Sequence, residues 1–347
     1  MRTVLAVLFA VAVTFAGGTS AFVSEATPKA GTNPGVAASQ TTVDSCREIS
    51  SPGRYALTDD VTNTTVSRCV RITANDVVLD GRGHRIDGVG AFGSAGVLVT
   101  GGSNVTVRNV AASDWDDGIR FAGVRNATVR NTTTTRNRVG LSLVSVRGGT
   151  VADNVARSNA VAGVFLVGAS ENNTLRNTTA TENALVGVQL VEASGNRVVG
   201  TVARGNQFGV ALFGANGNVV RGGEATGNRI AGIWLSGADD NRVRDNRVSN
   251  RFYGVYLADG ARNNTIAENV ARENAVGVRL RSSDRNAVLR NRIVGSSDAG
   301  ILLISSDENR VVGNRGAENR RDIVVSQSSS GNVLENNSLG RRTTRVR

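Results

Sequence analysis

Several residue types are scarce in this chain of 347 residues, and each scarcity narrows the choice of fold or site. The chain has one histidine, one methionine and two cysteines, which leaves few imidazole or sulfur ligands for a transition metal. It has three prolines, and aromatic residues make up only 4% of it, so a local group of rings stands out. Apolar residues at helical spacing are not sustained beyond the N-terminal segment, which argues against a helical fold.

Long hydrophobic runs are absent too, with one exception at the N-terminus. Arg2 precedes an apolar run over residues 4–16, and small residues follow at 17–21. This pattern predicts a secretory signal peptide over residues 1–21; a membrane anchor is the alternative, but an apolar run of about 13 residues is short for a bilayer. No other segment has the composition of a membrane span. We therefore expect an exported protein, located in the periplasm, at the cell surface or outside the cell, with residues 22–43 as a flexible linker.

Lysine is the last scarce type, because Lys29 is the only one and arginine carries the formal net charge of +11. Nucleic acid is the usual partner of such a chain, but export argues against it. The only contiguous basic run lies in the tail 339–347, which we expect to be disordered. Elsewhere arginines recur at one position of a repeat, namely Arg108, Arg130, Arg176, Arg244 and Arg290. A column of guanidinium groups suits an acidic polysaccharide or an anionic surface, and a solvated face is the alternative.

The abundant feature is that repeat, which has a period of roughly 23 residues. Its marker is a glycine followed by Val, Ile or Leu, then any residue, then an apolar residue. The glycines are Gly96, Gly118, Gly140, Gly163, Gly187, Gly209, Gly232, Gly254, Gly277 and Gly300. A fixed period of this size predicts a stacked-repeat architecture.

Each period holds three short extended pieces, rich in Val, Ile, Leu or Thr and bounded by Gly, Asn, Ser or Asp. In one period they cover residues 163–167, 172–177 and 178–183. The leucine frame and helical half of a leucine-rich repeat are missing. We therefore predict an all-β protein, a single-stranded right-handed parallel β-helix over residues 96–338, with about 10–11 coils of roughly 22–24 residues and three strands per coil.

Asparagines recur at two turns of the repeat. The first series is Asn104, Asn126, Asn173 (or Asn172), Asn196, Asn218, Asn241, Asn264, Asn286, Asn309 and Asn332. The second is Asn109, Asn131, Asn154, Asn177, Asn246, Asn269, Asn291, Asn314 and Asn337. Asn suits turns, and stacked copies can bond amide to amide, so we expect both series to be structural.

The two cysteines, Cys46 and Cys69, lie just before the repeats. In an exported protein they are expected to form a disulfide, within an N-terminal cap and first coils over residues 44–95. A pair of buried free thiols is the alternative. Such a cap would protect the unpaired edges of the first coil.

The cap region carries a sequence resemblance. CREISSPGRYAL at 46–57 is followed by CVRI at 69–72 and LDGRGHRIDG at 79–88. This succession resembles the opening of NosD-like right-handed β-helix proteins, which belong to the pectin-lyase-like superfold and its CASH repeats. The resemblance implies the fold over residues 44–338. It does not imply an activity, because the superfold hosts lyases, hydrolases, epimerases, adhesins and non-catalytic binders.

The family name also implies copper, which the residues argue against. Copper sites use Cys, Met or imidazole ligands, and a mature chain would offer no methionine, the single His84 and two oxidised cysteines. We expect no resident cofactor; Ca²⁺ is the alternative metal, and no motif indicates it.

A catalytic site on this fold needs grouped carboxylates. The best candidates are Asp114, Asp116 and Asp117, with Arg120 as a charge stabiliser. They lie in the turn that leads into a glycine-led strand, beside Trp115. The Gly-His-Gly and Arg-Ile-Lys segments of polygalacturonases are absent, as are pectate-lyase signatures. A surface turn is the alternative, and an enzyme of lyase, epimerase or hydrolase type stays open.

The variable positions of the glycine-led strand carry the remaining candidates. Side chains alternate along a strand, so two columns of variable residues should face outward. They include Phe165, Phe213, Trp234, Tyr256 and Arg279. We predict an exposed aromatic face that binds a polysaccharide or another component of the cell envelope. The alternatives are a face covered by another segment or by a second subunit, and a purely structural envelope protein. Among the Asn-x-Ser/Thr sequons, Asn63 lies outside both asparagine series and is the candidate for glycosylation.

Overall fold

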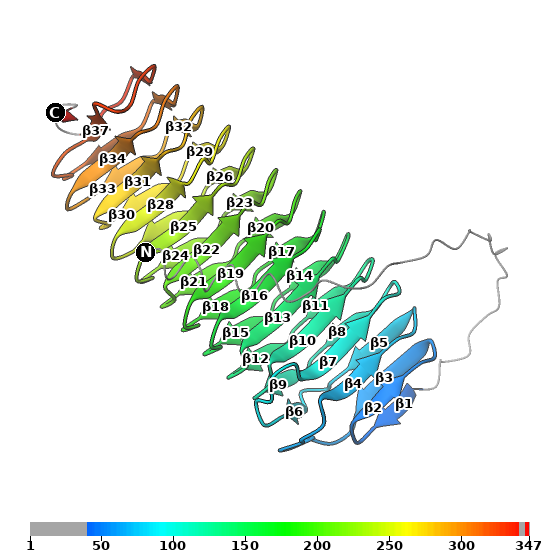
Figure 1. Cartoon of the computed structure of the whole chain (residues 1–347). Coiled ribbons are helices and arrows are strands. Elements are labelled where there is room, and N and C mark those ends of the chain that lie inside the picture. The colour runs from blue at the N-terminus through cyan, green and yellow to red at the C-terminus, as the bar shows by residue number, and fades with distance from the viewer. Residues whose placement is uncertain (1–39, 340–343, 347) are drawn as a thin grey trace, which may run out of the picture.

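The computed structural model describes residues 40–339 and 344–346, and its regular elements there are all β-strands (Figure 1). They wind into a parallel solenoid of about thirteen coils. The predicted fold class is confirmed, but ten or eleven coils was an undercount, because the region before the repeats also forms coils. The predicted signal peptide and most of the predicted linker lie outside the described residues. No described helix could cross a membrane.

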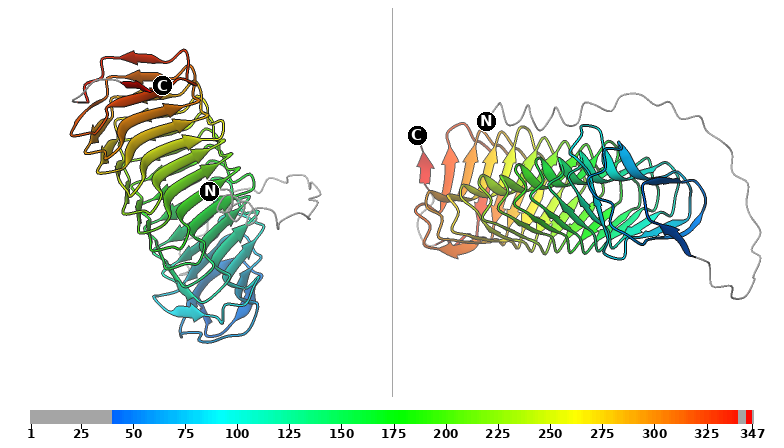
Figure 2. Two further views of the ribbon diagram at one scale, coloured as in Figure 1. Left: turned by 60° about the vertical axis from the view of Figure 1, so that its left-hand side comes forward. Right: turned by 90° about the horizontal axis from the view of Figure 1, so that it is seen from below.

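Three parallel sheets run along the rod and bound its interior (Figure 2). Sheet A contains β1 (Gln40–Val43), β3 (Gly53–Leu57), β5 (Val77–Asp80), β8 (Thr106–Arg108), β11 (Thr128–Arg130), β14 (Thr150–Ala152), β17 (Thr174–Arg176), β20 (Arg197–Val199), β23 (Val219–Arg221), β26 (Arg242–Arg244), β29 (Thr265–Ala267), β32 (Ala287–Leu289), β35 (Arg310–Val312) and β38 (Val333–Glu335). Sheet B contains β2 (Arg47–Ile49), β4 (Arg68–Ile72), β7 (Ala95–Thr100), β10 (Asp117–Ala122), β13 (Val139–Val144), β16 (Ala162–Val167), β19 (Val186–Val191), β22 (Phe208–Phe213), β25 (Ala231–Ser236), β28 (Tyr253–Ala258), β31 (Val276–Arg281), β34 (Ala299–Ile304), β37 (Ile323–Ser326) and β39 (Thr344–Val346). Sheet C contains β6 (Arg85–Asp87), β9 (Ala111–Ser113), β12 (Thr133–Thr135), β15 (Val155–Arg157), β18 (Thr179–Thr181), β21 (Val202–Arg204), β24 (Glu224–Thr226), β27 (Arg247–Ser249), β30 (Val270–Arg272), β33 (Arg292–Val294) and β36 (Arg315–Ala317).

The repeated glycine marks a place where consecutive coils approach too closely for a side chain. A Cβ built on Gly163 would lie 2.7 Å from the carbonyl oxygen of Gly187 and 2.9 Å from the side-chain amide nitrogen Nδ2 of Asn183. Both distances are far inside van der Waals contact, so only glycine fits. The residues after it alternate as expected: Val164 and Leu166 are 0% and 1% exposed and belong to the interior core of the rod.

Asparagine ladders line the interior corners of the rod. Three ladders are present, one more than the sequence analysis found. The one that follows sheet B contains the predicted Asn173 through Asn332. Asn104 and Asn126 were predicted in the same series but are exposed, with φ of 58° and 52°, and are not buried rungs. The third leads from sheet C into sheet B and was missed: Asn137, Asn159, Asn183, Asn206, Asn228, Asn250, Asn274 and Asn319. In a typical rung the Nδ2 of Asn206 donates to the Oδ1 of Asn228 at 3.1 Å.

The predicted second series is partly wrong as a ladder. Asn154, Asn246, Asn269, Asn291 and Asn314 are buried rungs. Asn109, Asn131 and Asn177 instead occupy the adjacent turn position with φ of 54°, 52° and 49°. The left-handed backbone explains Asn at those three sites, so the series mixes two structural roles.

The two ends of the rod confirm one expectation and correct two. Cys46 and Cys69 form the predicted disulfide. The flexible linker was expected to reach residue 43, but Gln40–Val43 forms β1, which pairs with β3. The tail was expected to be disordered, but Thr344–Val346 forms β39, which pairs with β37.

Candidate functional site

The predicted aromatic face lies on the outer side of sheet B, where strand pairing brings the residues into two columns. Trp234 stands directly between Ala211 and Tyr256, and Tyr256 is followed by Arg279. The predicted placement on one face is therefore correct. The predicted exposure is wrong, because these rings are only 1–4% exposed.

The buried part of this face forms a second apolar cluster, separate from the interior core. We call it the apolar strip, and it runs from β13 to β28. Its buried members are Val139, Ala162, Phe165, Val167, Val186, Val191, Phe208, Ala211, Phe213, Ala231, Trp234, Tyr256 and Ala258. Within it the ring of Trp234 stacks on Phe208 at a centroid distance of 4.4 Å and meets Phe213 edge-on at 4.8 Å. The rings thus pack on one another instead of presenting free faces.

Arg279, on β31, packs against the tyrosine rings at the β28 end of the apolar strip. Its guanidinium carbon lies 4.9 Å from the ring centroid of Tyr253 and 5.2 Å from that of Tyr256, which is cation–π geometry. Burial raises the pKa of Tyr256, against the lowering effect of the Arg279 charge. The arginine therefore packs against tyrosine rings, and its assignment to a glycan stays a prediction.

The candidate catalytic carboxylates separate into two groups. Asp114 lies on the outside of the turn, where its Oδ2 accepts a hydrogen bond from Arg136 Nη2 at 2.6 Å. Asp116 and Asp117 are 7% and 3% exposed. Trp115, which neighbours the candidate carboxylates in the sequence, belongs to the interior core and donates its indole N–H to the carbonyl oxygen of Ile86 at 3.0 Å.

Arginine side chains form ion pairs with the two buried carboxylates. Arg138 contacts both oxygens of Asp116, with Nη2 at 3.2 Å from Oδ2, and Arg120 Nη1 lies 3.3 Å from Asp117 Oδ2. Burial raises the pKa of Asp117 to about 6, although the Arg120 and Arg138 charges act in the opposite direction. Such a pKa suits a general acid or base, but a side chain that is 3% exposed cannot reach a polymer. The arrangement is that of a structural ion-pair cluster.

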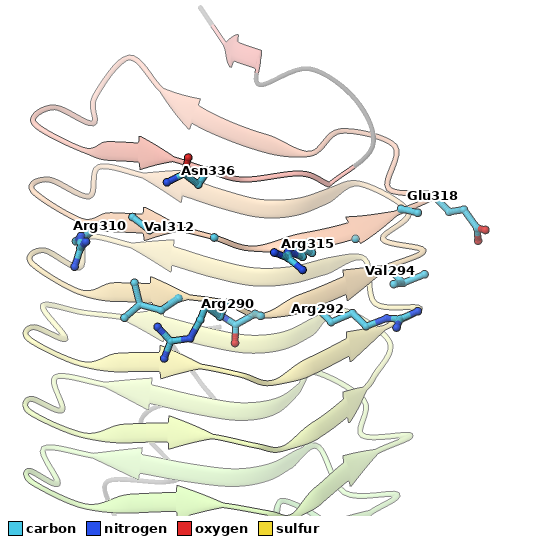
Figure 3. A pocket seen from close by; sticks show the side chains of 13 residues that line it. Arg290, Arg292, Val294, Arg310, Val312, Arg315, Glu318 and Asn336 are labelled. Carbon is cyan, nitrogen blue, oxygen red and sulfur yellow. The ribbon is translucent and has the colours of Figure 1, made fainter.

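An open groove lies elsewhere, at the outer corner between sheets A and C near the C-terminal end of the rod (Figure 3). Its volume is about 870 Å³. Four arginines line it. Arg310 begins β35, Arg292 and Arg315 begin β33 and β36, and Arg290 lies in the turn between β32 and β33.

The charge of this arginine groove is largely uncompensated. Arg290 pairs with Glu268, with 2.8 Å between Nη2 and Oε1. Arg292, Arg310 and Arg315 are exposed and make no ion pair within the residues that the structure describes. Arg292 and Arg315 are register partners on adjacent strands, so their Cα atoms stand about one strand spacing, roughly 4.8 Å, apart.

The sequence analysis found only part of this groove. Arg290 belongs to the predicted arginine column, but Arg292, Arg310 and Arg315 were not singled out. A signal was available, because arginine begins β33, β35 and β36, in each case directly after an asparagine (Asn291, Asn309 and Asn314). Recognising it required the three-sheet register, which places these positions around one corner.

Comparison with known proteins identifies the family. The sequence matches the family described as "Periplasmic copper-binding protein (NosD)" over residues 61–222 and 214–346. The chain belongs to the NosD family. No curated protein matches the sequence significantly.

Solved structures resemble this NosD-family chain in fold. The periplasmic alginate epimerase AlgG has a TM-score of 0.56 at 14% identity, over 84% of this chain and 76% of that one. A point mutant of AlgG reaches 0.62 at 15% identity, over the same shares of the two chains. The A-module of the Azotobacter vinelandii mannuronan C-5 epimerase AlgE4 has 0.55 at 16% identity, over 85% of this chain and 91% of that one. At these identities the likeness shows the shared parallel β-helix fold.

The described residues of this family member do not fit a copper site. Both cysteines are consumed by the disulfide. His84 is the only imidazole of the chain, so no second histidine ligand is available. Residues 40–339 and 344–346 hold no group of three or more His, Cys, Asp or Glu side chains placed to bind a metal ion. Asn63 is exposed, with φ of 50°, and its glycosylation stays a prediction.

Proposed function

We propose that this NosD-family protein is an exported binding protein that holds an acidic polysaccharide of the cell envelope in the arginine groove. The observation that carries the proposal is the open groove with four arginines, of which three have no carboxylate partner in the described part of the chain. Guanidinium groups without a carboxylate partner repel one another when they line one groove, and a polymer with one carboxylate per sugar would neutralise them through charge-assisted hydrogen bonds.

Three further facts support an acidic glycan over a neutral one. The net charge of +11 attracts polyanions over a distance set by the ionic strength. The groove lies on the outside of a rigid rod, where a linear polymer can follow consecutive coils (Figure 3). Proteins that share this fold include epimerases of alginate and mannuronan.

The proposed role is binding without catalysis. The groove contains one lining carboxylate, Glu318, whereas hydrolysis in most glycosidases uses a pair. The paired carboxylates Asp116 and Asp117 lie on another face of the rod and are engaged by Arg138 and Arg120. An enzyme of lyase, epimerase or hydrolase type is the second candidate, supported by the alginate and mannuronan epimerases that share this fold.

The test is affinity electrophoresis or calorimetry with sodium alginate, with dextran as the uncharged control. The double variant Arg292→Gln/Arg315→Gln removes two exposed charge contacts worth about 0.5–1 kcal/mol each, so we expect affinity to fall roughly 5- to 30-fold. Arg197→Gln/Arg242→Gln is the matched control, because it removes the same charge from two exposed strand starts of sheet A outside the groove.

Two results would contradict the proposal. One is equal loss of affinity in both double variants, which would show non-specific attraction to a basic protein. The other is equal binding of alginate and dextran. Turnover of alginate that is lost in Asp117→Asn would instead favour the enzyme.

A further inference from the structure

The arginine groove is built from three consecutive coils, and two of them carry its arginines (Figure 3). One coil supplies Arg290 and Arg292, the next supplies Arg310 and Arg315, and the third supplies Asn336. Neighbouring coils lie about 4.8 Å apart. The positive charge of the groove therefore occupies a short part of the rod.

The coils on either side of the two arginine-bearing coils end this positively charged segment. In the coil before them, Glu268 and Val270 occupy the positions of Arg290 and Arg292. In the coil after them, β38 ends with the exposed Glu335. A polyanion that runs past either end meets a carboxylate, and like charges repel. The groove thus selects a short segment of a polymer.

Gly313 leaves the second arginine-bearing coil bare at its centre. It occupies the turn position that Arg290 holds on the coil before and Asn336 on the coil after. Its φ is 69°, and asparagine takes the same turn position with φ of 52° at both Asn131 and Asn336. A Cβ on Gly313 would have one heavy atom within 4 Å, the Cγ of Arg290 at 3.4 Å. Neither backbone strain nor crowding requires glycine here, and its effect is to leave room for a ligand.

We propose that the arginine groove recognises two adjacent uronic-acid residues of a chain that lies along the rod, one residue on each arginine-bearing coil, with the second over Gly313. An extended chain of 1,4-linked pyranoses advances per sugar by about the coil spacing of roughly 4.8 Å. Carboxylates on adjacent sugars can therefore face guanidinium groups on adjacent coils. The inference rests on the proposed function and adds the direction of the chain and the length that is recognised.

The dependence of affinity on ligand length tests the proposal. Calorimetry measures the binding of mannuronate oligomers of one, two, three and six sugars to the full chain. Two sugars bring two carboxylates to the groove in one ligand, so we expect an affinity at least about tenfold above that of the single sugar. From two to six sugars we expect no more than about a fivefold gain, the number of ways to place two adjacent sugars of a hexamer on one site. Hyaluronan oligosaccharides, with a carboxylate on every second sugar, should bind like the single sugar.

Gly313→Asn tests the position of the second sugar. The added side chain fills the bare position, so we expect the affinity for the disaccharide to fall to that for the single sugar. Gly222→Asn is the matched control: Gly222 holds the equivalent turn position between β23 and β24 with φ of 62°, a Cβ there would have no heavy atom within 4 Å, and the residue lies outside the groove. We expect this control to bind like the wild type. Thermal unfolding of both variants checks that the fold is kept.

Two results would overturn the proposal and leave the proposed function intact. One is an affinity that rises by a similar factor with each added sugar up to six, which would show a polymer following the rod beyond the groove. The other is undiminished disaccharide binding by Gly313→Asn while Arg292→Gln/Arg315→Gln still weakens the binding of alginate. If neither alginate nor any oligomer binds to the wild type, the proposed function is refuted and this inference with it.

Discussion

Replacing one rung of an asparagine ladder should destabilise the rod by more than an ordinary buried polar substitution. Asn218 is 0% exposed. Its Nδ2 donates to the carbonyl oxygen of Ala193 at 2.9 Å, and its Oδ1 accepts the backbone N–H of Asn196 at 2.8 Å. Asn218→Ala leaves both backbone groups buried without a partner. At about 1–3 kcal/mol for each of the two groups left without a partner, we expect a loss of roughly 2–6 kcal/mol.

The loss is best measured locally as well as globally. Coils contact only their neighbours, so denaturation of a solenoid need not be a single cooperative step. Urea unfolding followed by circular dichroism gives the global change. Hydrogen exchange of the Asn196 amide gives the local one, and we expect it to accelerate by at least tenfold, since about 1.4 kcal/mol corresponds to a factor of ten.

The control is Asn216→Ala, two residues earlier in the same turn. Asn216 is exposed, and its Oδ1 accepts the N–H of Asp239 at 2.8 Å, which solvent can replace. We expect a change below about 1 kcal/mol. If Asn218→Ala costs no more than this control, or if exchange at Asn196 is unaltered, the reasoning about stranded backbone groups is refuted.

The structure fixes the direction of the stability change for three other perturbations. Because burial raises the pKa of Asp117 to about 6, the folded state keeps a proton that the unfolded chain releases. The contribution of Asp117 to the free energy of unfolding should therefore fall by up to about 3 kcal/mol between pH 4 and 6. The difference in urea midpoint between the wild type and Asp117→Asn measures this contribution, and an increase in that difference from pH 4 to 6 would contradict the prediction. Replacing Cys46 and Cys69 by serine should cost about 3 kcal/mol and accelerate hydrogen exchange in β2 and β4, with β22 as the internal reference. A Cβ on Gly232 would lie 2.8 Å from the carbonyl oxygen of Gly254, so Gly232→Ala should lower the free energy of unfolding by about 1–3 kcal/mol, measured as a lower urea midpoint. An unchanged midpoint would show that neighbouring coils can move apart to admit the methyl group.

The repeat made the scaffold predictable because steric contacts or hydrogen bonds fix the residue type at its most regular positions. Glycine is required where coils nearly touch, as at Gly163, and Val164 and Leu166 point inward because side chains alternate. The coil number was too low because the cap region lacks the glycine signature while its strands still pair in register. The third ladder shares the period of the other two and could have been read from the sequence.

The candidate sites were harder to predict because the exposure of a side chain depends on how it packs as well as on the face of the sheet to which it points. Alternation placed Trp234 on the outer face correctly, but only the packed structure shows that its ring is buried against Phe208 and Phe213. The cluster at residues 114–117 was grouped by sequence proximity, yet Trp115 turns into the core while Asp114 turns to solvent. The four arginines of the arginine groove come from three strands and one turn. Their placement around one groove depends on strand register, which a single repeat does not reveal.

The nearest-neighbour pairing of the coils has a consequence for how such a chain can change over generations. Each coil presents the same hydrogen-bonding edge above and below, so an extra coil can be inserted, or one removed, without disturbing those on either side. Every insertion lengthens the rod by about 4.8 Å and leaves the disulfide cap and the arginine groove intact. The protein can thus serve as a molecular ruler whose ends keep their chemistry while their separation is set by copy number.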